Sequence, residues 1–393
     1  MPTEVSTKTE RFTESVIREM TRRALACGAV NLAQGFPDFA APSELKEAAK
    51  RAIDSEFNQY AVTHGSANFR AAIAAKARSY NALDCDPDRS ITVTCGATEA
   101  MIASLLAIIN PGDEVIVFEP FYENYGPDAI IAGATPRYVA LRGPNYSIDR
   151  EELEKAFGPR TKAIVVNTPH NPTGKIFSRA ELELIASLCQ RHDTLAITDE
   201  IYEHIIYDGS QHVSLGSLPG MADRTSTISG LSKTYSVTGW RLAYAIASER
   251  LTGAIRKVHD FLTVGAPHPL QEAGATALRL PESFYADLVA SYTHKRTMLF
   301  DALTDAGLRC HIPQGAYYIM AGIDHLGFRN DFEAADFMLD KVGIAAVPGS
   351  SFYHRPELGH GMLRFTFSKS DETIARATER LQSLAAKLAE YRR

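Results

Sequence analysis

The feature that most constrains the fold is an alternation of apolar, β-prone runs with helical segments over residues 91–247. Most of the β-prone segments are near-continuous apolar runs, as is typical of strands buried on both faces of a helix-covered sheet. They are Ile91–Thr94, Glu114–Phe118, Pro136–Leu141, Ala163–Asn167, Leu195–Thr198, Thr225–Ile228 and Leu242–Ala247. Helical segments intervene at Thr98–Ile109, Tyr125–Ala132, Arg150–Phe157 and Arg179–Gln190. The pattern predicts an α/β fold with a mainly parallel, seven-stranded sheet between helices.

The flanking segments predict a second, smaller domain. Helical spacing is found at Glu14–Ala26, Ser43–Ile53, Ala67–Tyr80, Glu272–Leu280, Phe284–Ala306 and Asp371–Tyr391. Short strands are expected at Tyr317–Gly322, Ile344–Val347 and Met362–Phe367. We expect an N-terminal arm that forms part of the small domain (1–45), a large domain (46–285) and a C-terminal small α+β domain (286–393).

Composition narrows the classes of function. The net charge of −6, without a Lys/Arg-rich run, argues against a nucleic-acid surface. Five scattered cysteines without a Cys-x-x-Cys pair fit a reducing compartment and give no metal signature. The first twenty residues lack the apolar core of a signal peptide, and the longest apolar run, Met101–Ile109, is too short to cross a membrane. We therefore expect a cytoplasmic protein.

A single lysine stands where the strand predicted at Thr225–Ile228 leaves the sheet. The stretch that follows reads Ser229-Gly-Leu-Ser-Lys-Thr-Tyr-Ser-Val-Thr-Gly-Trp-Arg241, so Lys233 lies among small residues and Arg241 comes eight positions later. A partly desolvated lysine loses preference for its charged form and becomes an amine nucleophile toward an aldehyde. The Arg241 guanidinium suits a phosphate. Together they suggest pyridoxal phosphate (PLP); the alternative is a surface lysine in a polar loop.

Other strand ends carry residues that could complete such a site. Ligands of open α/β sheets lie at the carboxyl ends of the strands. The candidates there are Gly96, Ala97 and Thr98 for the phosphate, Tyr122 for the ring face, Asn171 for a phenolate oxygen and Asp199 for a protonated pyridine nitrogen. Each has a simpler alternative: an ordinary helix start for the first group, packing for the tyrosine, and a helix N-cap for Asp199.

Read together, these pieces resemble a known family over nearly the whole chain. The most specific are the Lys233–Arg241 stretch, Asn171-Pro-Thr-Gly174 and Asp199–Tyr202. They resemble the aspartate aminotransferase superfamily, the fold-type-I PLP enzymes of aminotransferase class I/II. The segment Gln34-Gly-Phe-Pro-Asp38, with Ser-Lys-Thr-Tyr and Thr-Gly-Trp-Arg, looks most like the kynurenine/glutamine and methionine aminotransferase branch.

The resemblance implies roles at the matching positions. Lys233 would carry the cofactor covalently and act as the proton shuttle. Substrate carboxylate would be bound by Arg364 with help from the Gly35 backbone, and Tyr60 would reach the phosphate of a neighbouring subunit in a homodimer. The cofactor would be held by Asp199, Asn171, Tyr202, Tyr122, Gly96, Ala97, Thr98 and Arg241. Relatives often carry Ser or Thr where this chain has Gly230, so Ser229 or Ser232 would supply the phosphate-binding hydroxyl.

The resemblance implies transamination between an amino acid and a 2-oxo acid by a ping-pong mechanism. The alternative on the same scaffold is a PLP-dependent lyase or cyclase, such as a carbon–sulfur β-lyase, because the same residues serve both outcomes. A nicotinamide dehydrogenase would need Gly-x-Gly-x-x-Gly after a strand, and the sequence has none. No second arginine for a side-chain carboxylate is recognisable, which favours aromatic, sulfur-containing or glutamine-like amino acids over strict aspartate specificity.

Overall fold

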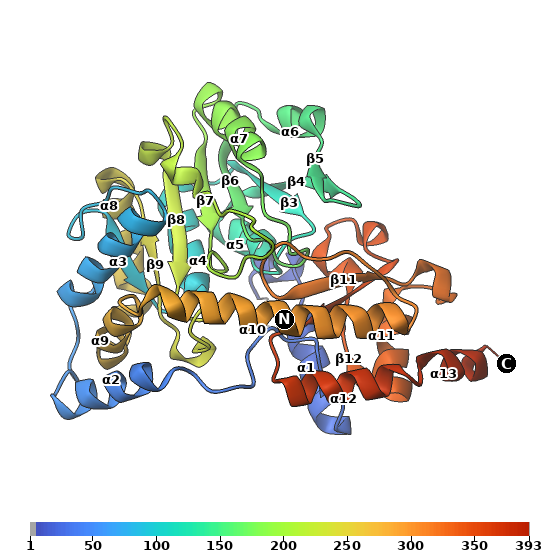
Figure 1. Ribbon diagram of the computed structural model, residues 1–393. Helices are drawn as coiled ribbons and strands as arrows, with labels where there is room; N and C mark the ends of the chain where they lie inside the picture. Colours follow the sequence, from blue (N-terminus) through green and yellow to red (C-terminus); the bar gives the residue numbers. More distant parts are fainter. Residues whose placement is uncertain (1–4, 393) are drawn as a thin grey trace.

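A large, mainly parallel sheet forms the centre of the molecule (Figure 1). The computed structural model describes residues 5–392; the first four residues of the predicted arm and the last residue of the predicted C-terminal domain lie outside them. Within 5–392, the strand order is β2-β9-β8-β7-β6-β3-β4-β5. The bounds are β2 Ile91–Thr94, β3 Glu114–Glu119, β4 Thr135–Arg142, β5 Ser147–Ile148, β6 Thr161–Asn167, β7 Leu195–Asp199, β8 Thr225–Gly230 and β9 Ala243–Ile246.

All seven predicted strands are present, and the two-residue β5 adds an eighth at the edge. The pairs β3–β4, β3–β6, β6–β7 and β7–β8 are parallel, whereas β9 runs antiparallel to both β2 and β8. Strands β2, β3, β6, β7 and β8 therefore share one direction. Their carboxyl ends meet at one edge of the sheet, where a site is expected.

Helices cover both faces of the sheet because successive strand residues point to opposite sides. Val165 of β6 packs with α4 (Ala97–Ile108) and α5 (Tyr125–Ala132), while Val166 packs on the other side with α7 (Arg179–Arg191). The remaining helices of the large sheet region are α2 Ser43–Asp54, α3 Ala67–Tyr80, α6 Arg150–Ala156, α8 Glu249–Thr263 and α9 His268–Ala277. Helix α8 was not predicted, although its amphipathic face buries Leu251 and Ile255.

The C-terminal part builds a second sheet that includes Arg364. Strands β10 (Arg309–Cys310), β11 (Tyr318–Gly322), β14 (Met362–Thr366) and β13 (Val347–Pro348) pair antiparallel in that order. The N-terminal arm joins it: α1 (Val16–Cys27) leads to β1 (Val30–Asn31), which pairs in parallel with β12 (Ile344–Ala345). Residues from opposite ends of the sequence thus share one core.

One long helix connects the two regions. Helix α10 (Glu282–Asp305) runs across the front of the view in Figure 1, from α9 toward α11 (Asp331–Phe337). The predicted C-terminal helix is divided into α12 (Asp371–Leu381) and α13 (Leu384–Tyr391). Both turn an apolar face inward, since Ile374, Leu381 and Leu388 are buried.

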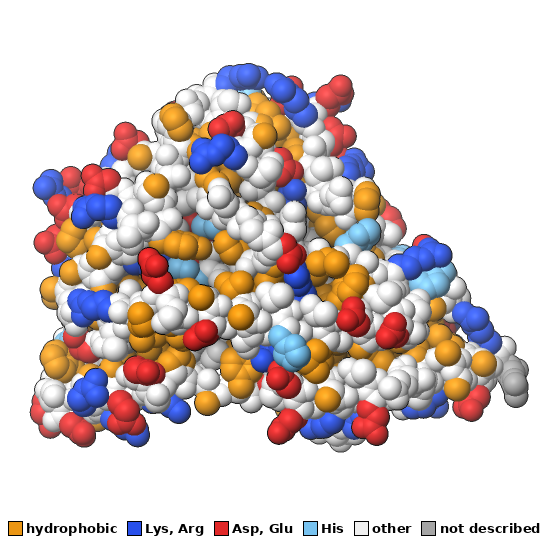
Figure 2. Space-filling view, in the orientation of Figure 1, with side chains coloured by type: hydrophobic (Ala, Val, Ile, Leu, Met, Phe, Trp, Pro, Cys, Tyr) orange, Lys and Arg blue, Asp and Glu red, His pale blue; other side chains and the backbone are white. Residues whose placement is uncertain are grey.

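Two surface properties bear on the predicted partners. On the face seen in Figure 2, lysine and arginine side chains are interspersed with aspartate and glutamate, unlike the basic stripe of a nucleic-acid surface. Among the described residues, none of the helices combines the length and the apolar character that crossing a membrane requires.

Candidate active site

A pocket lies at the carboxyl edge of the large sheet, where β11 and β14 of the second sheet face it. Eleven of the predicted site residues line it: Gly35, Ala97, Thr98, Tyr122, Asn171, Asp199, Tyr202, Ser232, Lys233, Arg241 and Arg364. They come from segments far apart in sequence. Most lie at the carboxyl ends of strands that share one direction, whereas Gly35 comes from the N-terminal arm and Arg364 from β14. The pocket is thus the candidate active site.

Lys233 lies in the loop that follows β8 and points into the pocket. Its Nζ donates to the carbonyl of Gly35 at 3.3 Å and lies 5.8 Å from the ring centres of Tyr202 and Tyr317. Burial lowers the pKa of Lys233 to about 8; Asp199 opposes this shift, and Arg241 and Arg364 add to it. Among the described residues, no carboxylate lies within 4.0 Å of its amine. This lysine has the environment of an amine nucleophile.

Arg241 and the start of α4 form the predicted phosphate end of the pocket. The guanidinium lies directly over Gly96, where an added Cβ would stand 2.2 Å from Nη2 of Arg241. Gly96 has φ +86°, which also favours glycine. Ala97 and Thr98 open the first turn of α4 and turn backbone N–H groups toward the same place. Gly96 itself serves as the platform for the arginine and does not line the pocket.

The Gly230 departure has a steric reason. A Cβ at Gly230 would lie 2.6 Å from the Cβ of Ala243 on β9, so a serine or threonine does not fit there. Of the two predicted substitutes, Ser232 lines the pocket. Ser229 instead donates its hydroxyl to Glu203, away from the pocket. The surviving candidate hydroxyl is that of Ser232.

Asp199 ends β7 and is buried. Its Oδ2 accepts from the hydroxyl of Tyr125 at 2.8 Å, and its Oδ1 accepts from the backbone N–H of Ile201 at 3.2 Å. Burial raises its pKa, against these two hydrogen bonds and the charge of Lys233, which lower it. The described residues after Asp199 form a turn rather than a helix, so the helix N-cap alternative is wrong. A carboxylate held in this way suits a cationic partner such as a protonated ring nitrogen.

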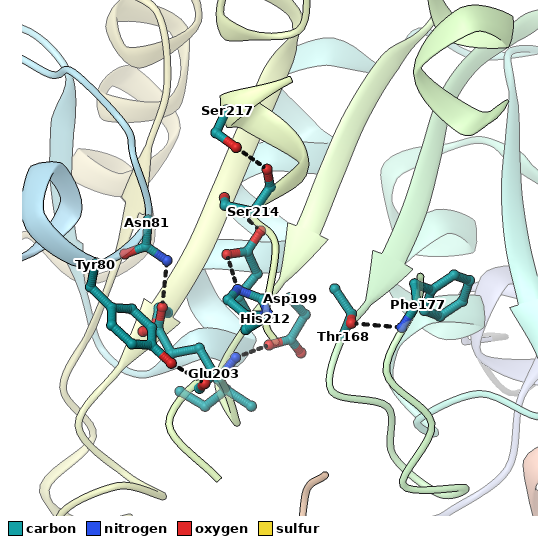
Figure 3. A network of polar contacts seen from close by, with 12 residues as sticks. Tyr80, Asn81, Thr168, Phe177, Asp199, Glu203, His212, Ser214 and Ser217 are labelled. Carbon is teal, nitrogen blue, oxygen red and sulfur yellow. Dashed lines mark hydrogen bonds and ion pairs between the residues drawn. The ribbon is translucent and has the colours of Figure 1, made fainter. Parts of the chain in front are cut away.

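A buried polar cluster lies behind the turn that follows Asp199, on the side away from the pocket, and holds this turn in place (Figure 3). Glu203 forms an ion pair with Lys76 of α3 and accepts from Asn81 at 2.7 Å. Glu200 accepts from His212 at 2.9 Å and from Ser214 at 2.9 Å. Burial would raise the pKa of Glu203, but Lys76 and the neighbouring donors lower it to about 2. The cluster holds the segment that presents Asp199 and Tyr202 to the pocket.

Arg364 is fully buried on β14, at 0% exposure. Its Nη1 donates to Asn171 Oδ1 at 2.8 Å and its Nη2 to the carbonyl of Ala33 at 2.7 Å. The guanidinium also stacks between the rings of Tyr318 (4.3 Å) and Phe352 (4.7 Å). Its Nε has no hydrogen-bond partner, and no carboxylate of the described residues lies within 4.0 Å. Arg364 is therefore not held as the partner of a protein carboxylate in the described part of the chain.

The pocket is also lined by residues that the sequence interpretation missed, among them Asn167, Tyr125, Tyr318 and Arg18. Asn167 links two strand ends, because its Nδ2 donates to the Asp199 carbonyl at 2.8 Å and its Oδ1 accepts from Asn171 N–H at 2.7 Å. A polar residue ending an apolar run was a usable signal for it.

One predicted site residue lies elsewhere. Tyr60 does not line the pocket of its own chain, and its side chain is 85% exposed. A large aromatic side chain left so open to solvent is consistent with a role toward another subunit.

Comparison with known proteins decides the family. The sequence pattern of the family "Aminotransferase class I and II" matches residues 28–381. The chain belongs to the class I and II aminotransferases. It is 35% identical to human kynurenine–oxoglutarate transaminase 1 and 34% identical to Escherichia coli methionine aminotransferase, each over 94% of this chain and 96% of the relative. The structure of N-succinyldiaminopimelate aminotransferase from Mycobacterium tuberculosis superimposes with a TM-score of 0.94 at 37% identity, covering 97% of this chain and all of that one.

These matches confirm the predicted family, fold and reaction. The aminotransferase is PLP-dependent, and the two curated relatives named above carry the names of transaminases. The residues present fit the cofactor, because the pocket offers an amine, an arginine suited to a phosphate and a buried carboxylate that has no cation of residues 5–392 within 4.0 Å. PLP supplies the electron sink of the reaction when it is bound.

Proposed function

We propose that Lys233 is the residue that holds PLP and moves the substrate proton. The observation that supports this most strongly is the position of its amine, which lies in the pocket with a pKa of about 8 and no paired carboxylate. Near neutral pH such an amine can both accept and return a proton. We assign it the role of base and then acid in each of two half-reactions, first with an L-amino acid and then with a 2-oxo acid, in ping-pong order.

The other pocket residues divide into three groups around Lys233. Asp199 would balance the ring nitrogen, Asn171 and Tyr202 would donate to the ring oxygen, and Tyr122 would cover the ring face. Arg364 would bind the α-carboxylate in bidentate fashion, with the Gly35 backbone beside it. The phosphate would be bound by Thr98, Ser232, Arg241 and the backbone of Ala97. The N–H of Gly96 donates to the Thr94 carbonyl at 2.8 Å, so Gly96 would contribute only by supporting Arg241.

We also propose that two copies of the chain form a homodimer with shared active sites. Exposed apolar side chains gather on neighbouring segments, 53–62 and 261–264, and include Tyr60, Val62 and Phe261, the last 92% exposed. His268, four residues after the second segment, ties it to the first: its ring centre lies 5.1 Å from that of Phe57, and its Nδ1 lies 3.0 Å from the Gln59 carbonyl. A patch of this kind marks an interaction surface. Tyr60 within it would complete the phosphate site of the partner.

The dimer has a direct test. Phe261→Asp should convert a dimer into a monomer in analytical ultracentrifugation. Tyr60→Phe should leave the dimer intact while weakening PLP binding, because only its hydroxyl is lost. A wild-type protein that sediments as a monomer would refute the proposal.

We further propose that the chain divides into the arm 1–45, the large domain 46–285 and the small domain 286–393. The parallel pairing of β1 with β12 supports grouping the arm with the C-terminal domain.

We place the protein in the cytoplasm, since all five cysteines are free.

Borohydride reduction tests the assignment of Lys233. Protein purified with PLP should be yellow, lose its long-wavelength absorbance on reduction, and yield a single modified peptide that contains Lys233. Modification of a different lysine, such as the buried Lys76, would overturn it.

A further inference from the structure

We propose that Lys369 is a positioning residue that fixes the backbone turn around Gly35, so that the Gly35 N–H is held ready for the substrate α-carboxylate. Lys369 does not line the pocket and acts through residues 34–36. The inference rests on the proposed function, in which Arg364 binds the α-carboxylate with the Gly35 backbone beside it.

Gly35 is the middle residue of a γ-turn on the pocket wall. The N–H of Phe36 donates to the carbonyl of Gln34 at 2.9 Å, which leaves the N–H and the carbonyl of Gly35 outside the turn's own hydrogen bond. The Gly35 carbonyl accepts from the hydroxyl of Tyr317 at 2.8 Å and from Lys233 at 3.3 Å. In the described part of the chain, the Gly35 N–H donates to no acceptor. A backbone donor left open on a pocket wall is available to an anionic ligand.

The amine of Lys369 holds the carbonyls on both sides of Gly35. Its Nζ donates to the Phe36 carbonyl at 2.8 Å and to the Gln34 carbonyl at 3.2 Å, and it lies 3.9 Å from the centre of the Phe36 ring. Lys369 is only 2% exposed, and no carboxylate of residues 5–392 lies within 4.0 Å of its amine. Burying such an amine is costly, so its placement on two carbonyls of one turn favours a function for that turn.

Two lysines hold this turn, and only one of them can do so throughout the reaction. Lys233 is assigned to the cofactor and the substrate proton, so its contact with the Gly35 carbonyl is given up when its amine reacts. Lys369 has no such assignment. Burial lowers the pKa of Lys369 to about 8, against the charge of Asp38, and its neutral amine still carries a hydrogen for each of the two carbonyls. The turn therefore stays anchored in either protonation state of Lys369.

The opposite side of the turn is closed by Tyr318. A Cβ at position 35 would stand 2.0 Å from the hydroxyl oxygen of Tyr318, so only glycine fits there. The guanidinium of Arg364 lies 4.3 Å from the ring centre of the same tyrosine and donates to the carbonyl of Ala33 at 2.7 Å. Because the turn and Arg364 are linked in this way, a shift of the turn would misalign its N–H with a carboxylate bound by Arg364.

Lys295 of α10 offers a matched control. It is 8% exposed, and its amine lies 5.3 Å from the ring centre of Phe39, three residues after the turn. Its partners differ, since it pairs with Asp371 at 3.0 Å and donates to the Ser291 hydroxyl at 3.0 Å. Lys369→Met and Lys295→Met thus each remove a buried amine beside the arm, but only the first releases the carbonyls of the turn.

The kinetic test compares L-phenylalanine with phenethylamine, which lacks the α-carboxylate, as substrates of the PLP-loaded enzyme. Lys369→Met should lower the ratio of kcat/KM values, amino acid over amine, by about tenfold, because a hydrogen bond to a charged group is lost. The loss should appear mainly in KM for the amino acid, and kcat/KM for the amine should not change. Lys295→Met should keep the wild-type ratio. An unchanged ratio in Lys369→Met, whether both values fall or neither does, overturns the proposal.

Arg364→Lys in the same assay separates this claim from the proposed function. Its ratio should collapse whatever the role of Lys369. A wild-type ratio in Arg364→Lys would refute the proposed carboxylate site itself. A collapsed ratio in Arg364→Lys beside a wild-type ratio in Lys369→Met would refute only the positioning role.

A second pair of variants keeps the test decisive if Lys369→Met does not fold. The ratio should then fall in Lys369→Arg, because a planar guanidinium cannot replace the compact amine between two carbonyls. It should stay at the wild-type value in Lys295→Arg. A wild-type ratio in Lys369→Arg would overturn the proposal.

Discussion

Two groups of charged residues flank the turn that follows β7, and they differ in how their charges are balanced. Behind the turn, Lys76 is paired with Glu203, and Glu200 accepts hydrogen bonds from His212 and Ser214, all of them nearly fully buried. In front of it, Lys233 and Arg364 have no carboxylate within 4.0 Å among the described residues. Because burying an unpaired charge is costly, a fold keeps such charges where a ligand completes them. The comparison separates cations that serve the structure from cations that serve the cofactor and substrate.

The largest effect is expected at Lys233. Lys233→Met removes the amine that moves the substrate proton, so turnover should fall by about a thousandfold or more. PLP should still bind through Arg241, Ser232 and the α4 N-terminus, and thermal stability should not fall. Single-turnover kinetics, equilibrium dialysis and thermal unfolding measure these three properties. Near-normal turnover in this variant would show that another group moves the proton.

The opposite result is expected at Lys76. Lys76→Met leaves Glu203 charged and unpaired in the interior, which should lower the free energy of unfolding by about 3 kcal/mol. Adding Glu203→Leu removes the orphaned charge and should recover much of that loss. Urea unfolding of the single and double variants tests the pairing; a double variant no more stable than Lys76→Met would contradict it.

Asp199 stands between the two groups, at the end of β7. Asp199→Asn keeps the shape and can retain the hydrogen bond from Tyr125, but it removes the charge that faces the ring nitrogen. Turnover should fall by about a hundredfold, since an electrostatic partner in a desolvated site is lost. Stability should change little, because burial already disfavours the charged carboxylate. Retention of near-normal kcat would assign Asp199 a structural role only.

Most of the fold could be predicted from the sequence, because strands buried on both faces and amphipathic helices show clear hydrophobic patterns. Helix α3, Ala67–Tyr80, has the predicted bounds. Short elements such as β5 were missed because a strand of two residues is too short to show a hydrophobic pattern. The predicted site residues follow strand ends, where parallel strands must converge. Tyr318 and Arg18 were missed because they reach the pocket through packing between the two sheet regions and the arm, which the sequence does not encode locally.

The smallest effect concerns pH. Lys233 has a lowered pKa of about 8, so its neutral, nucleophilic fraction rises as pH increases through that value. The rate at which cofactor-free protein captures PLP should therefore increase about fivefold from pH 7 to pH 8 and level off above pH 9. Stopped-flow absorbance measures it. A rate that still rises about sevenfold between pH 9 and pH 10 would indicate an ordinary lysine pKa.

The central claim, that the unpaired cations of the pocket are kept for ligands, is tested most directly at Arg364. Its planar fork matches a carboxylate in bidentate fashion, which lysine cannot reproduce. The measurement is kcat/KM for an amino acid and for the amine that lacks its α-carboxylate, in wild type and in Arg364→Lys. We predict that the preference for the amino acid collapses by about tenfold or more while the cofactor absorbance is retained. Equal losses on both substrates, with lower thermal stability, would contradict the claim and make Arg364 a structural residue.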